Sequence, residues 1–302
     1  MNGLITLVLI LTPLFIGFFL PNTPKLTHFA ERALGWLVFL ILLVIGIELG
    51  LVDNLHQKIS QIALYLSSLL ALTLGFGTLA LMVFDKISWR AAHQGTTTTV
   101  QKISLRGSLT QLICLAIGFI MAKFLPTQML PPHDTTTVLL MGLLLLVGIS
   151  LKGSGTTLKE AMLNKRGVQI SLVFMVVTSL AGAVFAMLFD EVSLNKGLAL
   201  SAGWGWYSLS GTVMTDAYGA VWGSVALLND LSREIIALMC IPWLMRHSRS
   251  AAIGLGGVTS LDFTLPTLQQ AGGVQIVPTV ISFGFITNVV SPILMVFFSS
   301  FG

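Results

Sequence analysis

Charge is the property this sequence has least of. Lys, Arg, Asp and Glu make up 9% of its 302 residues, while the hydrophobic fraction is 55% and the mean hydropathy is +0.91. This balance excludes an ordinary soluble domain and is typical of an integral membrane protein. Repeated apolar runs of about 20 residues predict an all-α polytopic protein rather than a barrel.

Cysteine and histidine are also scarce where chemistry would need them. Cys114 and Cys240 both fall inside predicted helices, with no metal-ligand or disulfide spacing. All five histidines fall in predicted loops, which excludes a His proton relay or a zinc site within the membrane. No Walker sequence occurs, and Gly203-x-Gly205 lacks the third glycine of a dinucleotide loop. We therefore expect no enzyme, no cofactor and no metal.

Eight apolar segments predict membrane spans. They are Gly3 to Leu20, Leu34 to Leu51, Ile59 to Phe84, Ser108 to Phe124, Thr137 to Leu151, Gly167 to Phe189, Ala220 to Leu244 and Val274 to Phe301. No positive segment precedes the first span and no cleavage site follows it, so we expect a retained helix rather than a signal peptide.

The basic residues in the loops predict the orientation, because cytoplasmic loops carry the excess of Lys and Arg. The first, third and fifth loops hold ten: Lys25, Arg32, Lys86, Arg90, Lys102, Arg106, Lys152, Lys159, Lys165 and Arg166. The second, fourth and sixth hold three: Lys58, Lys123 and Lys196. We expect both termini in the periplasm. The formal charge of +4 thus reflects topology, and no clustered basic face predicts a nucleic-acid partner.

The first two thirds of the chain contain an internal repeat. Ile16-Gly17-Phe18 recurs as Ile117-Gly118-Phe119, and the leucine-rich run 42–49 resembles 145–151. Since each copy has three spans, the copies must cross the membrane in opposite directions. The predicted units are residues 1–85 and 107–190 as inverted repeats, 86–106 as a cytoplasmic linker, and 191–302 as a transport unit.

Two segments of that last unit are too short, too glycine-rich and too polar for ordinary spans. They are Leu198 to Gly219 and Ala252 to Gly273, and each is followed by a clear span. Irregular backbone at membrane depth survives only when it is buried in protein or lines a wet cavity. Two re-entrant segments give eight spans, the arrangement we favour, and two fully crossing segments give ten.

Acidic residues within these apolar stretches are the best indication of function. A charge at membrane depth costs roughly 2.5 to 3.5 kcal/mol on insertion scales, so such groups usually handle ions, protons or cationic substrates. Asp230, Arg233 and Glu234 share one predicted helix, where the spacing allows one ion pair and a surplus carboxylate. Asp262 in the second broken segment adds another negative charge. The alternative is a structural ion pair.

Other candidate residues surround these charges. Ser208, Ser210, Thr259, Ser260 and Thr264 offer hydroxyls for a zwitterionic substrate. The aromatic residues Trp204, Trp206 and Tyr207 could cover an aliphatic stem or make a cation-π contact, or they could belong to an interfacial aromatic belt. Glu48 could take part in transport or be an interfacial charge near Asp53.

Three strings of this sequence resemble the bacterial LysO-type lysine exporters. They are Gly203-Trp-Gly-Trp-Tyr-Ser-Leu-Ser-Gly211, Asn229-Asp-Leu-Ser-Arg-Glu234, and Arg249-Ser250 leading into Thr259-Ser-Leu-Asp-Phe-Thr-Leu-Pro266. The resemblance covers nearly the whole chain. It implies export of L-lysine and analogues such as thialysine across the inner membrane, coupled to proton entry. The intramembrane acidic pair maps onto Glu234 and Asp262, and Asn229 joins the candidates.

Carboxylates and carbonyls alone would serve an inorganic cation/proton exchanger equally well. A channel or a purely structural membrane protein is an alternative hypothesis from a different functional class. The expected partners are L-lysine, protons and the lipid bilayer, with the proton motive force in place of a cofactor. The role of sodium, a homodimer, the selectivity among basic amino acids, and an elevator or rocking movement all stay open.

Overall fold

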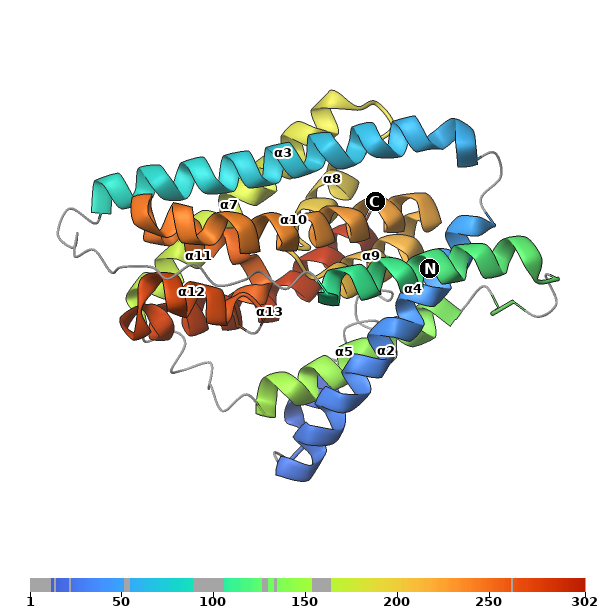
Figure 1. Ribbon diagram of the computed structural model, residues 1–302, viewed down its shortest axis with the longest axis horizontal. Coiled ribbons are helices and arrows are strands. Elements are labelled where there is room, and N and C mark those ends of the chain that lie inside the picture. The colour runs from blue at the N-terminus through green and yellow to red at the C-terminus, as the bar shows by residue number, and fades with distance from the viewer. Residues whose placement is uncertain are drawn as a thin grey trace.

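The computed structural model describes residues 12–13, 15–21, 23–51, 55–88, 106–126, 130–132, 135–153, 164–261 and 263–301 (Figure 1). All regular secondary structure in these residues is helical. The elements are α2 (Pro24–Gly50), α3 (Leu55–Ser88), α4 (Arg106–Phe124), α5 (Thr135–Gly153), α7 (Lys165–Leu188), α8 (Leu194–Ser201), α9 (Tyr207–Tyr218), α10 (Ala220–His247), α11 (Arg249–Gly256), η2 (Gly257–Leu261), α12 (Leu265–Gly272), η3 (Val274–Ile276) and α13 (Val277–Ser300).

The all-α prediction is confirmed for the described residues. Four helices there are long and apolar enough to cross a membrane, over Pro24–Ile47, Ile59–Ile87, Lys165–Leu188 and Val277–Ser300. The count of eight spans stays a prediction. Most of the first predicted span and residues 89–105 of the predicted linker lie outside the described residues.

The start of the second span was predicted too late. Helix α2 begins at Pro24, ten residues before Leu34, so Lys25 and Arg32 lie on a helix and not in a loop. Proline is favoured in the first turn because its missing N–H has no helical partner there in any case. Lys and Arg are also good helix formers, so polarity ends the apolar run but not the helix.

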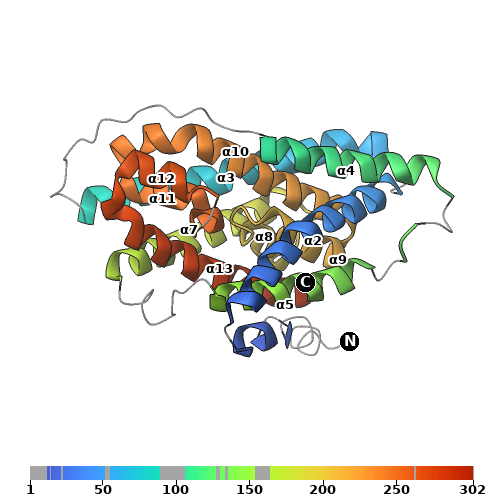
Figure 2. The same ribbon diagram turned by 60° about the horizontal axis from the view of Figure 1, so that its bottom comes forward.

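The helices form two groups in space. Helices α3 and α10 run side by side along the long axis and pack with α7 to α9 and α11 to α13, while α2 and α5 cross α3 and α10 obliquely (Figure 1). Helix α2 packs mainly against α4 and α5, and these three form what we call the panel. Figure 2 shows α2 passing between α5 and α4. The third helix of each predicted repeat, α3 or α7, packs against the broken segments and not against the panel.

Gly17 and Gly118 make reciprocal close contacts between the two predicted repeats. A Cβ on Gly17 would lie 2.2 Å from the carbonyl oxygen of Leu145, and one on Gly118 would lie 2.1 Å from that of Leu43. Each glycine belongs to an Ile-Gly-Phe motif and packs on the leucine-rich run of the other copy. Two copies related by a two-fold axis would make this reciprocal pair of contacts.

Each broken segment doubles back on itself. The Lys196 ammonium at the start of α8 lies 5.0 Å from the ring centroid of Tyr218, the last residue of α9. At the opposite end of α10, a Cβ on Gly272, the last residue of α12, would lie 3.0 Å from Met245 Sδ, close to where α11 begins. We call residues 194–218 hairpin 1 and residues 249–272 hairpin 2. They enter the helix bundle from opposite ends of α10.

Replacing Gly118 with Ala tests the close packing of the panel. The new Cβ would meet the backbone of Leu43, which no rotamer change can relieve, so the free energy of unfolding should fall by more than about 2 kcal/mol. Thermal unfolding of the purified protein in detergent measures this. Gly142→Ala is the matched control, because its nearest neighbour would be 3.9 Å away. Equal stability of the two variants would contradict the packing.

Candidate functional site

The two hairpins meet where their helices are broken. The backbone N–H of Val258 in η2 donates a 3.0 Å hydrogen bond to the carbonyl of Trp204, between α8 and α9. Gly257 has a φ of 58°, and a Cβ there would lie 2.1 Å from the same carbonyl oxygen. Only glycine fits this approach, for both reasons. The two irregular segments therefore satisfy part of each other's backbone in the interior.

Helix α13 holds both breaks at this crossing. The side-chain amide of Asn288 donates to the carbonyl of Val258 at 2.9 Å, and the Ser291 hydroxyl donates to that of Ala202 at 2.7 Å. The two side chains lie three residues apart and so share one helix face. An unpaired backbone carbonyl in an apolar interior costs several kcal/mol, and these two bonds remove that cost.

Trp204 anchors the first break to α7. Its φ of 51° lies in the left-handed region, which costs a non-glycine residue about 1 to 3 kcal/mol. The indole N–H donates to Thr178 Oγ1 at 2.9 Å, and the ring lies against Phe174 with the centroids 5.5 Å apart. These contacts hold the backbone of Trp204 in its unusual conformation. Trp204 is 2% exposed, and its predicted contact with a substrate stays a prediction.

The four candidate residues of α10 are all buried, although three of them are ionisable. Asn229, Asp230, Arg233 and Glu234 have exposed fractions between 1% and 3%. Asn229 donates to Asp230 Oδ1 at 3.1 Å, and Asp230 Oδ2 lies so close to Gly203 that a Cβ there would come within 2.1 Å. The same Cβ would lie 3.0 Å from Ser210 Cβ. Asp230 therefore faces the break of hairpin 1.

Arg233 turns to the other hairpin. Its Nη2 donates to the carbonyl of Gly254 at 2.8 Å, and its guanidinium carbon lies 5.2 Å from the ring centroid of Phe174. Gly254 is in the last turn of α11, where carbonyls lack helical partners and the helix dipole favours a cation. The spacing allowed an ion pair with Asp230, but these two residues do not form one. The guanidinium instead stabilises the end of a broken helix.

The hydroxyls of hairpin 2 converge over Gly256. Thr259 donates to the Gly256 carbonyl at 2.7 Å and lies 3.3 Å from Thr264 Oγ1, while Ser260 donates to the carbonyl of Ile253 at 3.0 Å. All three residues are buried, and Thr259 and Ser260 satisfy carbonyls in the last turn of α11. In this arrangement they cap a broken helix. Binding of a substrate by them stays a prediction.

The corresponding residues of hairpin 1 open α9. Tyr207 is the first residue of this helix and is half-buried, while Ser208 and Ser210 in the first turn are fully buried. Ser210 Oγ donates to the Tyr207 carbonyl at 3.4 Å. Trp206 occupies the N-cap position of α9 and supplies no side-chain cap.

Two predicted site residues are not placed here. Asp262 lies outside the described residues, and so does the side chain of Glu48, whose backbone belongs to α2 in the panel. The expected proximity of Asp262 to Glu234 therefore stays a prediction. Glu234 itself is buried on α10, one turn after Asp230 and so on the same helix face.

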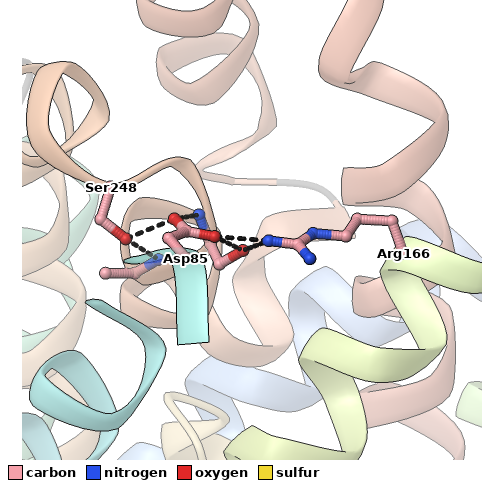
Figure 3. A network of polar contacts seen from close by, with 5 residues as sticks. Asp85, Arg166 and Ser248 are labelled. Carbon is pink, nitrogen blue, oxygen red and sulfur yellow. Dashed lines mark hydrogen bonds and ion pairs between the residues drawn. The ribbon is translucent and has the colours of Figure 1, made fainter. Parts of the chain in front are cut away.

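Asp85, at the end of α3, was missed as a polar anchor. Figure 3 shows its carboxylate between Ser248 and Arg166. It accepts hydrogen bonds from the hydroxyls of Ser248 (2.5 Å) and Ser250 (2.6 Å), and from the N–H of Ser250 (2.9 Å), and it forms an ion pair with Arg166 (2.5 Å). This network fixes the root of hairpin 2 to α3 and α7. In the sequence, Asp85 stood out only as a marker of the repeat.

The other end of α3 holds the root of hairpin 1. Gln61 Nε2 donates to both carboxylate oxygens of Glu191 at 3.1 Å, and the Tyr65 hydroxyl donates to one of them at 2.8 Å. Glu191 lies three residues before α8. One continuous helix of 34 residues thus ties together the roots of both hairpins.

Two opposed hairpins that meet beside buried acidic residues are typical of ion-coupled secondary transporters. The comparisons with known proteins make the class specific. The family model described as "Lysine exporter LysO" matches residues 112–299. A relative from Escherichia coli (strain K12), called "Lysine exporter LysO", is 38% identical over 296 residues, which cover 97% of this chain and 99% of the relative. The chain belongs to the LysO lysine exporter family.

A second relative, from Haemophilus influenzae and called "Putative lysine exporter", is 44% identical over 190 residues. The match covers 63% of this chain and 97% of that shorter relative. No solved structure matches this chain.

The indole anchor of Trp204 can be tested with two variants of Thr178. Thr178→Val removes the acceptor and leaves a buried N–H unpaired, which should lower the free energy of unfolding by about 1 to 3 kcal/mol. Thr178→Ser keeps the hydroxyl and should stay within about 1 kcal/mol of the parent protein. Denaturant unfolding followed by tryptophan fluorescence measures both. A valine variant as stable as the serine variant would contradict the anchor.

Proposed function

We propose that this protein is a secondary-active exporter of L-lysine, and of analogues such as thialysine, across the bacterial inner membrane, driven by proton entry. Two relatives carry names that describe lysine export, and one of them matches along almost the whole chain. The single observation that supports the mechanism is the position of Asp230, buried on α10 beside the break of hairpin 1, with Glu234 buried one turn further along the same helix.

Competition for these carboxylates would couple lysine to protons. A carboxylate can hold the ammonium group of lysine or a proton, but not both at once. Arg233 donates to the Gly254 carbonyl and lies over the Phe174 ring, so it forms no ion pair with Asp230, although its charge still acts on that carboxylate. Protonation from the periplasm would then release lysine, and loss of the proton to the cytoplasm would restore the site.

At the crossing, the N-terminus of α9 and the C-terminus of α11 would bind the oppositely charged groups of an amino acid. The N-terminus of α9 has a positive dipole, which favours the α-carboxylate of the cargo. The carbonyls that end α11 and the carboxylates of α10 favour ammonium groups. A zwitterion with a cationic side chain would satisfy both sets of groups.

We further propose how the parts divide in the membrane. The hairpins enter from opposite faces, which leaves eight spans with both termini in the periplasm. The panel and its two-fold exchange of glycine contacts would form the inverted-repeat scaffold. Because α3 and α7 hold the hairpin roots, they would move with the hairpins, so the moving unit would be larger than residues 191–302.

Flux measurements test the proposal. Proteoliposomes loaded with labelled L-lysine should empty faster when the outside is acidified, and Glu234→Gln should reduce this flux to background because a neutral amide cannot exchange a proton. Asp262→Asn should behave in the same way. Asp190→Asn removes a carboxylate that is exposed at the end of α7, and it should keep the parent flux.

Two other outcomes would overturn parts of this proposal. Flux retained by both Glu234→Gln and Asp262→Asn would contradict the coupling scheme. Proton-driven sodium flux without lysine flux would replace it with an inorganic cation exchanger. Correct folding of each variant is checked by its elution from size-exclusion chromatography in detergent.

A further inference from the structure

A second ammonium-binding arrangement lies at the root of hairpin 1, away from the crossing. The Lys196 Nζ lies 4.7 Å from the ring centroid of Trp222 and 5.0 Å from that of Tyr218. It also donates a 3.1 Å hydrogen bond to the backbone carbonyl of Glu191. We call these two rings and this carbonyl the Lys196 cage. Together they give a primary ammonium two π faces and one acceptor.

The walls of the cage are held from outside it. The Trp222 ring stacks on Tyr65 of α3, with centroids 4.8 Å apart and an interplanar angle of 21°. The Tyr65 hydroxyl donates to Glu191, which also accepts from Gln61. None of these contacts involves Lys196. The cage would therefore keep its shape if the Lys196 side chain moved out.

The Lys196 cage also has polar groups that the Lys196 side chain does not contact. The Tyr218 hydroxyl oxygen is buried and has no hydrogen-bond partner among the described residues. The carboxylate of Glu191 lies nearby and is exposed, as are Asp216 and Gly219 at the adjoining turn. A ligand with an ammonium head and a polar tail could place its head among the rings while its tail remains in water.

The occupant of the cage is chemically the side chain of the proposed cargo. We propose that the Lys196 cage is an exit site for the side-chain ammonium of L-lysine, and that Lys196 is a tethered competitor that displaces the departing cargo. This inference rests on the proposed function, because it takes lysine as the cargo. A tethered group acts at an effective concentration of the order of millimolar, so free lysine would be held only weakly at this end.

Equilibrium dialysis of labelled L-lysine against purified protein tests the exit site. In a Glu234→Gln background, which disables the central site, adding Lys196→Met should create new binding at least about fivefold tighter than any residual binding in the background. Lys196→Arg in the same background keeps a cation over the rings and should bind no better than the background. Adding Trp222→Leu to the Met variant should remove the new binding.

Two results of this experiment would overturn the exit site. One is a folded Lys196→Met variant whose lysine affinity equals that of the background. The other is new binding that survives Trp222→Leu. Thermal unfolding identifies the folded variants.

A second measurement uses the unmodified chain, and so does not depend on how the variants fold. Added L-lysine should displace Lys196 from the cage and speed its reaction with an amine-selective reagent, as measured by mass spectrometry, while L-leucine should not. An unchanged rate would overturn the inference. If lysine flux by the unmodified protein is intact in that case, only the exit site fails, whereas absence of lysine flux overturns the proposed function itself.

Discussion

The hydrogen bond between Trp204 and Val258 is the contact on which the rest of the site depends. It joins two stretches of backbone that have left the helical conformation in an apolar interior, where each unpaired N–H or C=O costs several kcal/mol. Asn288 and Ser291 of α13 satisfy neighbouring carbonyls, and Arg233 satisfies the end of α11. With the breaks stabilised in this way, α10 can carry the buried carboxylate of Asp230 against the break of hairpin 1.

The hairpins are held at their roots as well as at their tips. Helix α3 contacts Glu191 before hairpin 1 at one end and Ser248 and Ser250 at the root of hairpin 2 at the other. Both roots are thus fixed to one rigid element, while the panel contacts this group of helices through other surfaces. The contacts place α3 and α7 with the hairpins, although the repeat pattern in the sequence groups them with the panel helices.

The sequence predicted the helices well, because long apolar runs leave little choice of structure in a membrane. The ends of the helices were less certain. Helix α2 starts ten residues before the predicted span, because Pro24 begins a helix whose first turns are polar. The glycine-rich breaks and the buried charges on α10 were also visible, since both are unusual in apolar surroundings. What could not be predicted was the partner of each group. Arg233 lies one turn from Asp230 yet binds a carbonyl of hairpin 2, and Asp85 binds serines more than 160 residues away.

The Gly257→Ala variant tests the crossing most directly. A Cβ at this position would lie 2.1 Å from the Trp204 carbonyl oxygen, so the account predicts that proton-driven lysine flux in proteoliposomes falls to background. Gly75→Ala on α3, where a Cβ would meet nothing within 4 Å, should leave the flux unchanged. Parental flux in the Gly257→Ala variant would contradict the account, because the two hairpins could not then meet at this contact during transport.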